Sequence, residues 1–144
     1  MPEQDTVKLL RECDAGIKMG VASIDEVFQY VHDAELKNNL ECCKTEHEKL
    51  KTEVQRRLEQ YQDEGKEPNP VAKGMSWMKT NVMLIMDESD ETIADLMTDG
   101  CNMGVKSLHR YLNQYQKADA DAKAIAEALA RSEETLAVRV RKYL

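Results

Sequence analysis

Residues 16–24 read Gly-Ile-Lys-Met-Gly-Val-Ala-Ser-Ile, and residues 100–108 read Gly-Cys-Asn-Met-Gly-Val-Lys-Ser-Leu. Both glycines, the Met, the Val and the Ser recur at the same spacing, and the last position stays aliphatic. Each copy lies in a longer stretch with apolar residues three and four apart, which is typical of one face of a helix. The repeat therefore predicts two copies of one helical hairpin packed against each other, with the phrase in the first helix of each copy.

The first hairpin is predicted over residues 6–63. Asp5 is placed to cap its first helix, and Asp33 is placed to cap its second. The apolar stripe of the second helix ends near Tyr61. Gly65 stops the helix there, and Pro68-Asn69-Pro70 prevents a restart before the next stripe.

The second hairpin is predicted over residues 90–143, after a crossover at 64–89 that contains a short helix of its own. Ser89 or Asp90 is expected to cap the first helix of this hairpin. The sequence shows no period-two alternation and no Asn-Gly hairpin turn, so we expect no strands. The predicted fold class is all-α, a four-helix bundle that forms one domain over residues 1–144.

Composition narrows the range of partners and locations. The net charge of −7 over 144 residues argues against binding to nucleic acid, which needs a basic surface. No apolar run approaches the roughly 20 residues that span a bilayer, and the polar start of the chain does not resemble a signal peptide. We therefore expect a cytoplasmic protein with no membrane partner, in which all four cysteines are free thiols.

The stretch from Gly20 through His32-Asp33-Ala34-Glu35-Leu36-Lys37 to Glu46, together with Trp77 in the crossover, is similar to the ferritin-like superfamily. More closely, the chain resembles bacterial ferritin-like proteins of uncharacterised function, and the resemblance covers nearly the whole chain. It implies a ferritin-like four-helix bundle. Metal-binding members of the superfamily place a carboxylate on the inner face of all four main helices, and two helices add a Glu-x-x-His pair.

The chain departs from that metal-binding pattern. Glu46 is next to His47 instead of three residues before it, so the two side chains project about 100° apart around a helix. Asp99 and Asn102 have the spacing of the pair but the wrong second residue. We therefore predict that the di-iron site has been lost and that iron storage and ferroxidase activity do not follow from the resemblance. No catalytic residue and no cofactor are predicted.

His47 is the one ionisable residue squarely on an apolar stripe, and Cys43 faces the same way four residues earlier. One interpretation is a site for zinc or iron with the ligands Cys43, His47, Cys101 and Glu133, or Glu134 in place of the last. The interpretation that we favour is a buried histidine hydrogen-bonded to Ser132, Ser23 or a water molecule. Cys42 and Cys43 form a vicinal pair for which no neighbour predicts a lowered thiol pKa.

The repeated phrase carries glycines four residues apart in each copy: Gly16, Gly20, Gly100 and Gly104. Each glycine costs about 1 kcal/mol in a helix interior, so the four need a structural reason. We favour a close approach of the two repeat helices, backbone against backbone. The alternative is a hollow that holds a metal ion, water or a small ligand.

The crossover is rich in methionine, and its predicted interface residues are Met75, Trp77, Met78 and Met83. We expect one side of this segment to pack on the bundle and the other to contact a second subunit. The predicted function is therefore a non-enzymatic scaffold or interaction module that forms a homodimer. The alternatives are a metal- or thiol-based binding protein and a small-molecule binder that uses the glycine-lined faces.

Overall fold

The computed structural model describes the backbone of residues 2–144 and the side chains of residues 3–70 and 79–144. Five α-helices pack against one another, and residues 2–144 contain no strand, so the all-α prediction is confirmed. The helices are α1 (Pro2–Phe28), α2 (Ala34–Gln60), α3 (Pro70–Met86), α4 (Asp90–Gln114) and α5 (Ala120–Val140), followed by the 3₁₀ turn η1 (Arg141–Tyr143).

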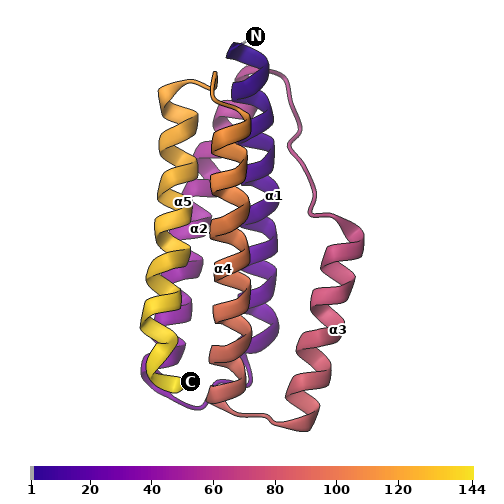
Figure 1. Ribbon diagram of the computed structural model, residues 1–144, viewed down its shortest axis with the longest axis vertical. Coiled ribbons are helices and arrows are strands. Elements are labelled where there is room, and N and C mark those ends of the chain that lie inside the picture. The colour runs from indigo at the N-terminus through magenta and orange to yellow at the C-terminus, as the bar shows by residue number, and fades with distance from the viewer. Residues whose placement is uncertain (1) are drawn as a thin grey trace.

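The four long helices lie side by side, and the shorter α3 stands on the flank of α1 and α4 (Figure 1). Helices α1 and α2 form one antiparallel pair, and α4 and α5 form another. The two pairs meet where α2 packs on α5 and where α1 packs on α4 and α5. A long connection that includes α3 joins the end of α2 to the start of α4.

Short polar side chains set where most of the helices begin. Asp33 accepts a hydrogen bond from the backbone N–H of Leu36, as predicted for the cap of α2. Ser89 rather than Asp90 caps α4, and Asp119 caps α5. The predicted cap at Asp5 is wrong. Helix α1 begins at Pro2, and Asp5 instead accepts the backbone N–H of Lys117 in the loop between α4 and α5.

The connection after α2 is fastened to α1 by Asp14, whose side chain is 1 % exposed. One carboxylate oxygen accepts the backbone N–H of Lys66 at 3.0 Å and pairs with the ammonium of Lys18 at 2.8 Å. Gly65 has a φ of +92°, and a β-carbon there would lie 3.1 Å from Cγ of Asp14 and closer still to Oδ2. Glycine is therefore required at the point where the connection crosses α1.

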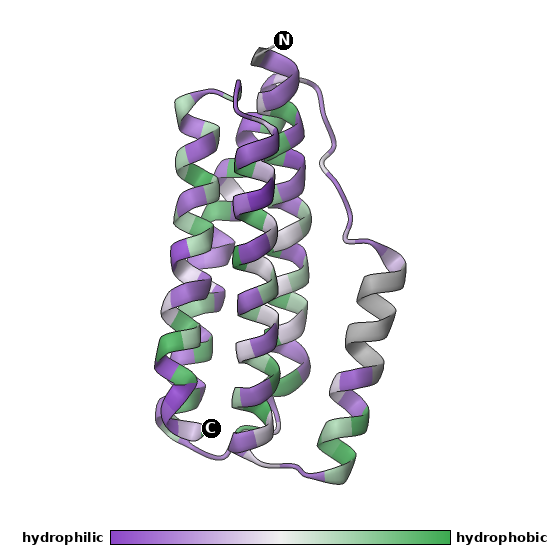
Figure 2. Cartoon of the chain, viewed as in Figure 1, coloured by the Kyte–Doolittle hydropathy of each residue, from purple (hydrophilic) through white to green (hydrophobic). Residues whose placement is uncertain are grey.

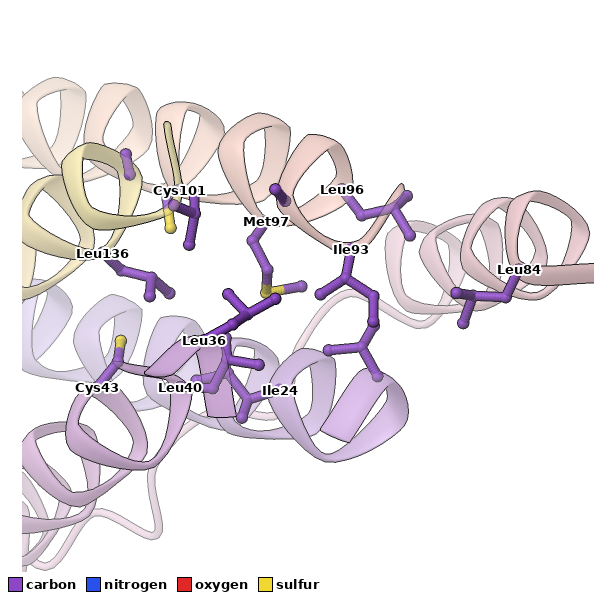
Figure 3. Close-up of a cluster of buried hydrophobic side chains, with 14 residues drawn as sticks. Ile24, Leu36, Leu40, Cys43, Leu84, Ile93, Leu96, Met97, Cys101 and Leu136 are labelled. Atoms are coloured by element: carbon purple, nitrogen blue, oxygen red, sulfur yellow. The ribbon is translucent and has the colours of Figure 1, made fainter. Parts of the chain in front are cut away.

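Apolar residues, green in Figure 2, recur along all four long helices. Those that are buried form two separate clusters. The lower core, at the end of the molecule where α5 ends, is shown in Figure 3 and consists of Ile24, Val27, Leu36, Leu40, Cys43, Leu84, Ile93, Ala94, Leu96, Met97, Cys101, Leu136, Ala137 and Val140. The upper core consists of Leu9, Leu10, Cys13, Ile17, Val54, Leu58, Leu108, Ala118, Ala122, Ile125, Ala126, Leu129 and Ala130. Burial of these side chains is the main favourable term for folding.

Candidate functional site

A layer of small and polar residues separates the two cores. We call it the middle layer, and it consists of Gly20 from α1, His47 from α2, Gly104 from α4, and Ser132 and Glu133 from α5. On every long helix these residues fall between the last member of one core and the first member of the other. His47 is 1 % exposed and Glu133 is 9 % exposed. Ionisable groups at this depth need partners, because burial penalises a lone charge.

Both ring nitrogens of His47 face hydrogen-bond acceptors. Nδ1 lies 2.9 Å from the carbonyl oxygen of Cys43, and because a carbonyl can only accept, Nδ1 carries a hydrogen. Nε2 faces Oε1 of Glu133 at 3.7 Å. Burial alone lowers the pKa of His47, but Cys43 and Glu133 outweigh burial and raise it to about 10. The geometry and the charges both favour the imidazolium form.

Glu133 is the acidic partner of this pair. Burial raises the pKa of its carboxyl group, and the neighbouring His47 opposes that rise. Its second oxygen, Oε2, is buried and has no hydrogen-bond partner among the described residues. Oε2 points at the backbone of Gly104, where a built β-carbon would lie 2.7 Å from Cδ of Glu133 and closer still to Oε2. The carboxylate therefore occupies the space that a side chain at position 104 would fill.

The surroundings of the glycines in the repeated phrase differ from the backbone-to-backbone contact that we favoured from the sequence. A β-carbon at Gly20 would lie 3.1 Å from Cδ2 and Nε2 of His47, so Gly20 and Gly104 both face side chains. Gly16 has only ordinary clearance from Leu129, and Gly100 has no such atom within 4 Å. The second glycine of each copy thus makes room for a polar side chain that another helix carries.

Cys43 adjoins the middle layer from the lower core. Its Sγ lies 3.6 Å from Nδ1 of His47 and 3.8 Å from Oγ of Ser132. Ser132 is in turn 3.4 Å from Nδ1, which is the serine contact that the sequence suggested for a buried His47. Cys101 belongs to the lower core, and burial, together with the charges of Glu133 and Cys43, raises its thiol pKa to about 12.

The suggested metal ligands Cys43, His47 and Glu133 form a chain of neighbours, and Cys101 lies in the adjoining core. They are not arranged around one point. Within the part of the chain whose side chains are described, no group of three or more His, Cys, Asp or Glu residues is placed to hold a metal ion. Nδ1 of His47 is directed at a carbonyl, and the carboxylate of Glu133 is directed partly at Gly104. Glu134 is exposed.

The interface predicted on the crossover is described only in part. The side chains of Met75, Trp77 and Met78 lie outside the described residues, and Met83 is half-buried against the lower core. The exposed apolar residues of α3 are instead Val82, Ile85 and Met86. Ile85 and Met86 follow Val82 by three and four residues, a spacing that places all three on one helix face and that was visible in the sequence.

Two further buried charges were not anticipated from the sequence. Asp14 fastens the crossover, as described above. Arg57 of α2 is 8 % exposed, and its Nη2 donates to Asp119 at 2.6 Å in the loop before α5. Arg57 lies three residues after the buried Val54, so helical spacing places it on the inner face.

None of the helices in the described chain is both long and apolar enough to cross a membrane. Comparison with protein-family models, with curated proteins and with solved structures finds no match for this chain.

Proposed function

We propose that the chain is a ferritin-like four-helix bundle that has lost its di-iron centre and acts by protein–protein contact, as a homodimer and without catalysis. Two features support the fold. Helices α1, α2, α4 and α5 form two antiparallel pairs, and a single long connection joins the pairs at the point where ferritin-like bundles have theirs. The repeated phrase occupies the first helix of each pair.

The donor set of the middle layer does not fit a di-iron centre. Such a centre takes a carboxylate from each of four helices and a histidine from two of them. Here α1 and α4 contribute Gly20 and Gly104, and only His47 and Glu133 are potential ligands among the middle-layer residues. The side chains of this pair fill the space in front of the glycines. We therefore assign no iron chemistry to the layer.

The observation that carries the proposed function is an apolar stripe on the outer face of α3. Val82, Ile85 and Met86 are 54 %, 84 % and 82 % exposed and stand within one turn of each other. The other face of α3 packs on the bundle through Leu84 and the half-buried Met83. Exposed apolar side chains that cluster in this way typically mark a contact surface.

A second copy of the chain fits this stripe by its charge pattern. If two α3 helices pair antiparallel so that Val82 of each opposes Ile85 of the other, Lys79 of each lies beside the end of the other α3 at Met86, where the chain continues through Glu88. Lys79 and Glu88 are both exposed at the surface. Opposite charges at the two ends of an apolar stripe would align the pair and fix its register.

Sedimentation velocity over a range of micromolar concentrations tests the proposal. We expect the wild-type chain to dimerise and Ile85→Glu to be monomeric. Met103→Glu is the matched control, because Met103 is 70 % exposed but lies on α4. A monomeric wild-type chain, or equal loss of the dimer in both variants, would overturn the proposal.

A charge exchange tests the register of the two helices. We expect Lys79→Glu to weaken the dimer and the double variant Lys79→Glu/Glu88→Lys to restore it, since the exchange recreates the pair with its signs reversed. Lys79 also pairs with Asp99 of its own chain at 3.1 Å, so Asp99→Asn serves as a control for the loss of that contact. If dimer formation is the same in all three variants as in the wild-type chain, the antiparallel pairing of α3 is ruled out.

A further inference from the structure

Ion pairs attach the segment between α2 and α4 to the rest of the fold. We call residues 62–86 of this segment the strap, and its first part runs along the outer side of α1 before α3 begins (Figure 1). The pairs are Asp63–Arg11, Lys66–Glu12, Glu67–Lys18 and Lys79–Asp99. The first three join the strap to α1, and the last joins it to α4.

The charges of α1 and of the strap match in order. Along α1 the charged residues are Arg11, Glu12 and Lys18, and along the strap their partners follow as Asp63, Lys66 and Glu67. A shift of the strap that moved Lys66 towards Arg11, or Glu67 towards Glu12, would bring like charges together. Electrostatic complementarity therefore fixes the register of the strap on α1.

Lys18 is at the centre of this attachment. Its ammonium lies 3.0 Å from Oε1 of Glu67 and 3.5 Å from the carbonyl oxygen of Lys66. It also lies 2.8 Å from Oδ2 of Asp14, the oxygen that accepts the backbone N–H of Lys66. One positive charge thus connects the strap to a buried carboxylate of α1.

The apolar attachment of the strap is small. Leu84 is the one described residue of α3 that belongs to the lower core, and the upper core contains no described residue of α3. Pro68 is also buried, and Met83 is half-buried against the lower core. All other members of the two cores lie outside the strap, so the long helices keep nearly all of their buried apolar contacts if the strap leaves.

We propose that the strap is a conformational switch held closed by charge. The ion pairs with α1 and α4 keep it docked, and screening or removing these charges releases residues 62–86 as one unit while the four long helices stay folded. Pairs of this kind lie at the surface, where each contributes little alone and where salt weakens its attraction.

Release changes the surface that α3 presents. Residues 82–86 read Val-Met-Leu-Ile-Met, and in the docked strap Met83 and Leu84 face the bundle while Val82, Ile85 and Met86 face outward. A released α3 presents all five side chains. The strap therefore controls how much apolar surface the helix offers for contact.

Hydrogen–deuterium exchange of the full chain, read by peptide mass spectrometry at one pH, tests the switch. Between about 10 mM and about 1 M sodium chloride the Debye length falls from about 30 Å to about 3 Å. We expect amides of the strap to exchange at least five-fold faster at high salt, because a single helix of this length is marginal in water once undocked. Amides of α5 should change less than two-fold. Exchange in the strap that is independent of salt, or an equal change in α5, overturns the proposal.

A matched pair of variants tests the role of Lys18. Lys18→Met keeps the length of the side chain and removes its charge, so the strap should exchange at least three-fold faster at low salt, relative to α5 in the same molecules. Lys44→Met is the control, because it removes the pair with Asp25, which joins α1 to α2. If Lys18→Met does not fold by circular dichroism, Glu67→Gln provides the test, since Glu67 is 79 % exposed. A folded variant whose strap exchanges no faster than that of Lys44→Met contradicts the proposal.

The switch does not depend on the proposed dimer. Its partners for the strap lie on α1 and α4, whereas the dimer uses the outer face of α3. The monomeric variant Ile85→Glu should therefore show the same dependence of strap exchange on salt. Loss of that dependence in Ile85→Glu would mean that the outer stripe, and not the ion pairs, holds the strap.

Discussion

The carboxylate of Glu133 lies against the backbone of Gly104, in the space that a side chain at position 104 would occupy. Gly20 has the same relationship to the ring of His47. The second glycine of each repeated phrase therefore faces one member of the buried pair that separates the two cores. The glycines that suggest helix packing in the sequence therefore line the polar middle layer in the folded chain.

This relationship predicts opposite effects for two substitutions four residues apart. Gly104→Ala should destabilise the fold by roughly 1–3 kcal/mol, because the new methyl displaces a buried carboxylate that is paired with His47. Gly100→Ala should stabilise it by up to about 1 kcal/mol, because a β-carbon there meets nothing within 4 Å and alanine favours the helix. Urea unfolding of both variants measures the difference.

A double-mutant cycle identifies the cause of the Gly104 effect. In a Glu133→Ala background the methyl has no carboxylate to displace, so Gly104→Ala should become neutral or stabilising. An unchanged penalty in that background would mean that some other neighbour sets the need for glycine.

Local patterns were enough to predict the all-helical fold, the cap at Asp33 and the burial of His47. Each depends on residues within a few positions of one another along the chain. The misplaced cap at Asp5 shows the limit of this reasoning, because its actual partner is the backbone of Lys117, which comes near only when the helices pack.

Local sequence patterns could not predict the role of the glycines, for the same reason. Gly20 and Gly104 are explained by His47 and Glu133, which belong to two other helices. Glu133 follows Ser132, one of the expected partners of His47, and its burial depends on the space that Gly104 leaves on α4. The sequence shows the glycines and the polar residues, but it does not show which of them lie opposite one another in the folded chain.

The buried pair predicts a loss of stability at alkaline pH. The pKa of His47 is raised from 6.5 to about 10 in the folded chain, so its contribution is complete below pH 6.5 and is lost as the pH rises to about 10. The free energy of unfolding should therefore decline across that window. His47→Gln should be less stable than wild type at pH 6.5, and its stability should vary less between pH 6.5 and 9.

The other ionisable groups with raised pKa values affect the free energy of unfolding in different pH ranges. The raised thiol pKa values of Cys13 and Cys101 also lower stability with rising pH, but only above their ordinary value of 9.0. The raised pKa of Glu133 acts from 4.5 upward, so the difference between wild type and His47→Gln is the quantity to measure. Parallel curves for the two proteins from pH 6.5 to 9 would contradict the assignment.

The attachment of the crossover to α1 predicts a change in proteolysis. Asp14→Ala removes the acceptor for the Lys66 N–H and the partner of Lys18, so the segment at 61–69 should be cleaved faster by trypsin after Lys66. Asp25→Ala is the matched control, since it removes only the surface pair with Lys44. Equal cleavage rates in the two variants would mean that Asp14 does not hold the segment.

The composition of the middle layer predicts low metal content in protein purified in reducing, chelator-free buffer. Zinc and iron should be far below one atom per chain by elemental mass spectrometry, because Nδ1 of His47 carries a hydrogen toward Cys43 and α1 and α4 offer only glycine at this level. His47→Ala and wild type should then give the same values. Stoichiometric zinc that is lost in His47→Ala would instead require Cys43, His47 and Glu133 to rearrange around an ion, and the ligand set suggested by the sequence would replace the ion pair as the explanation of the layer.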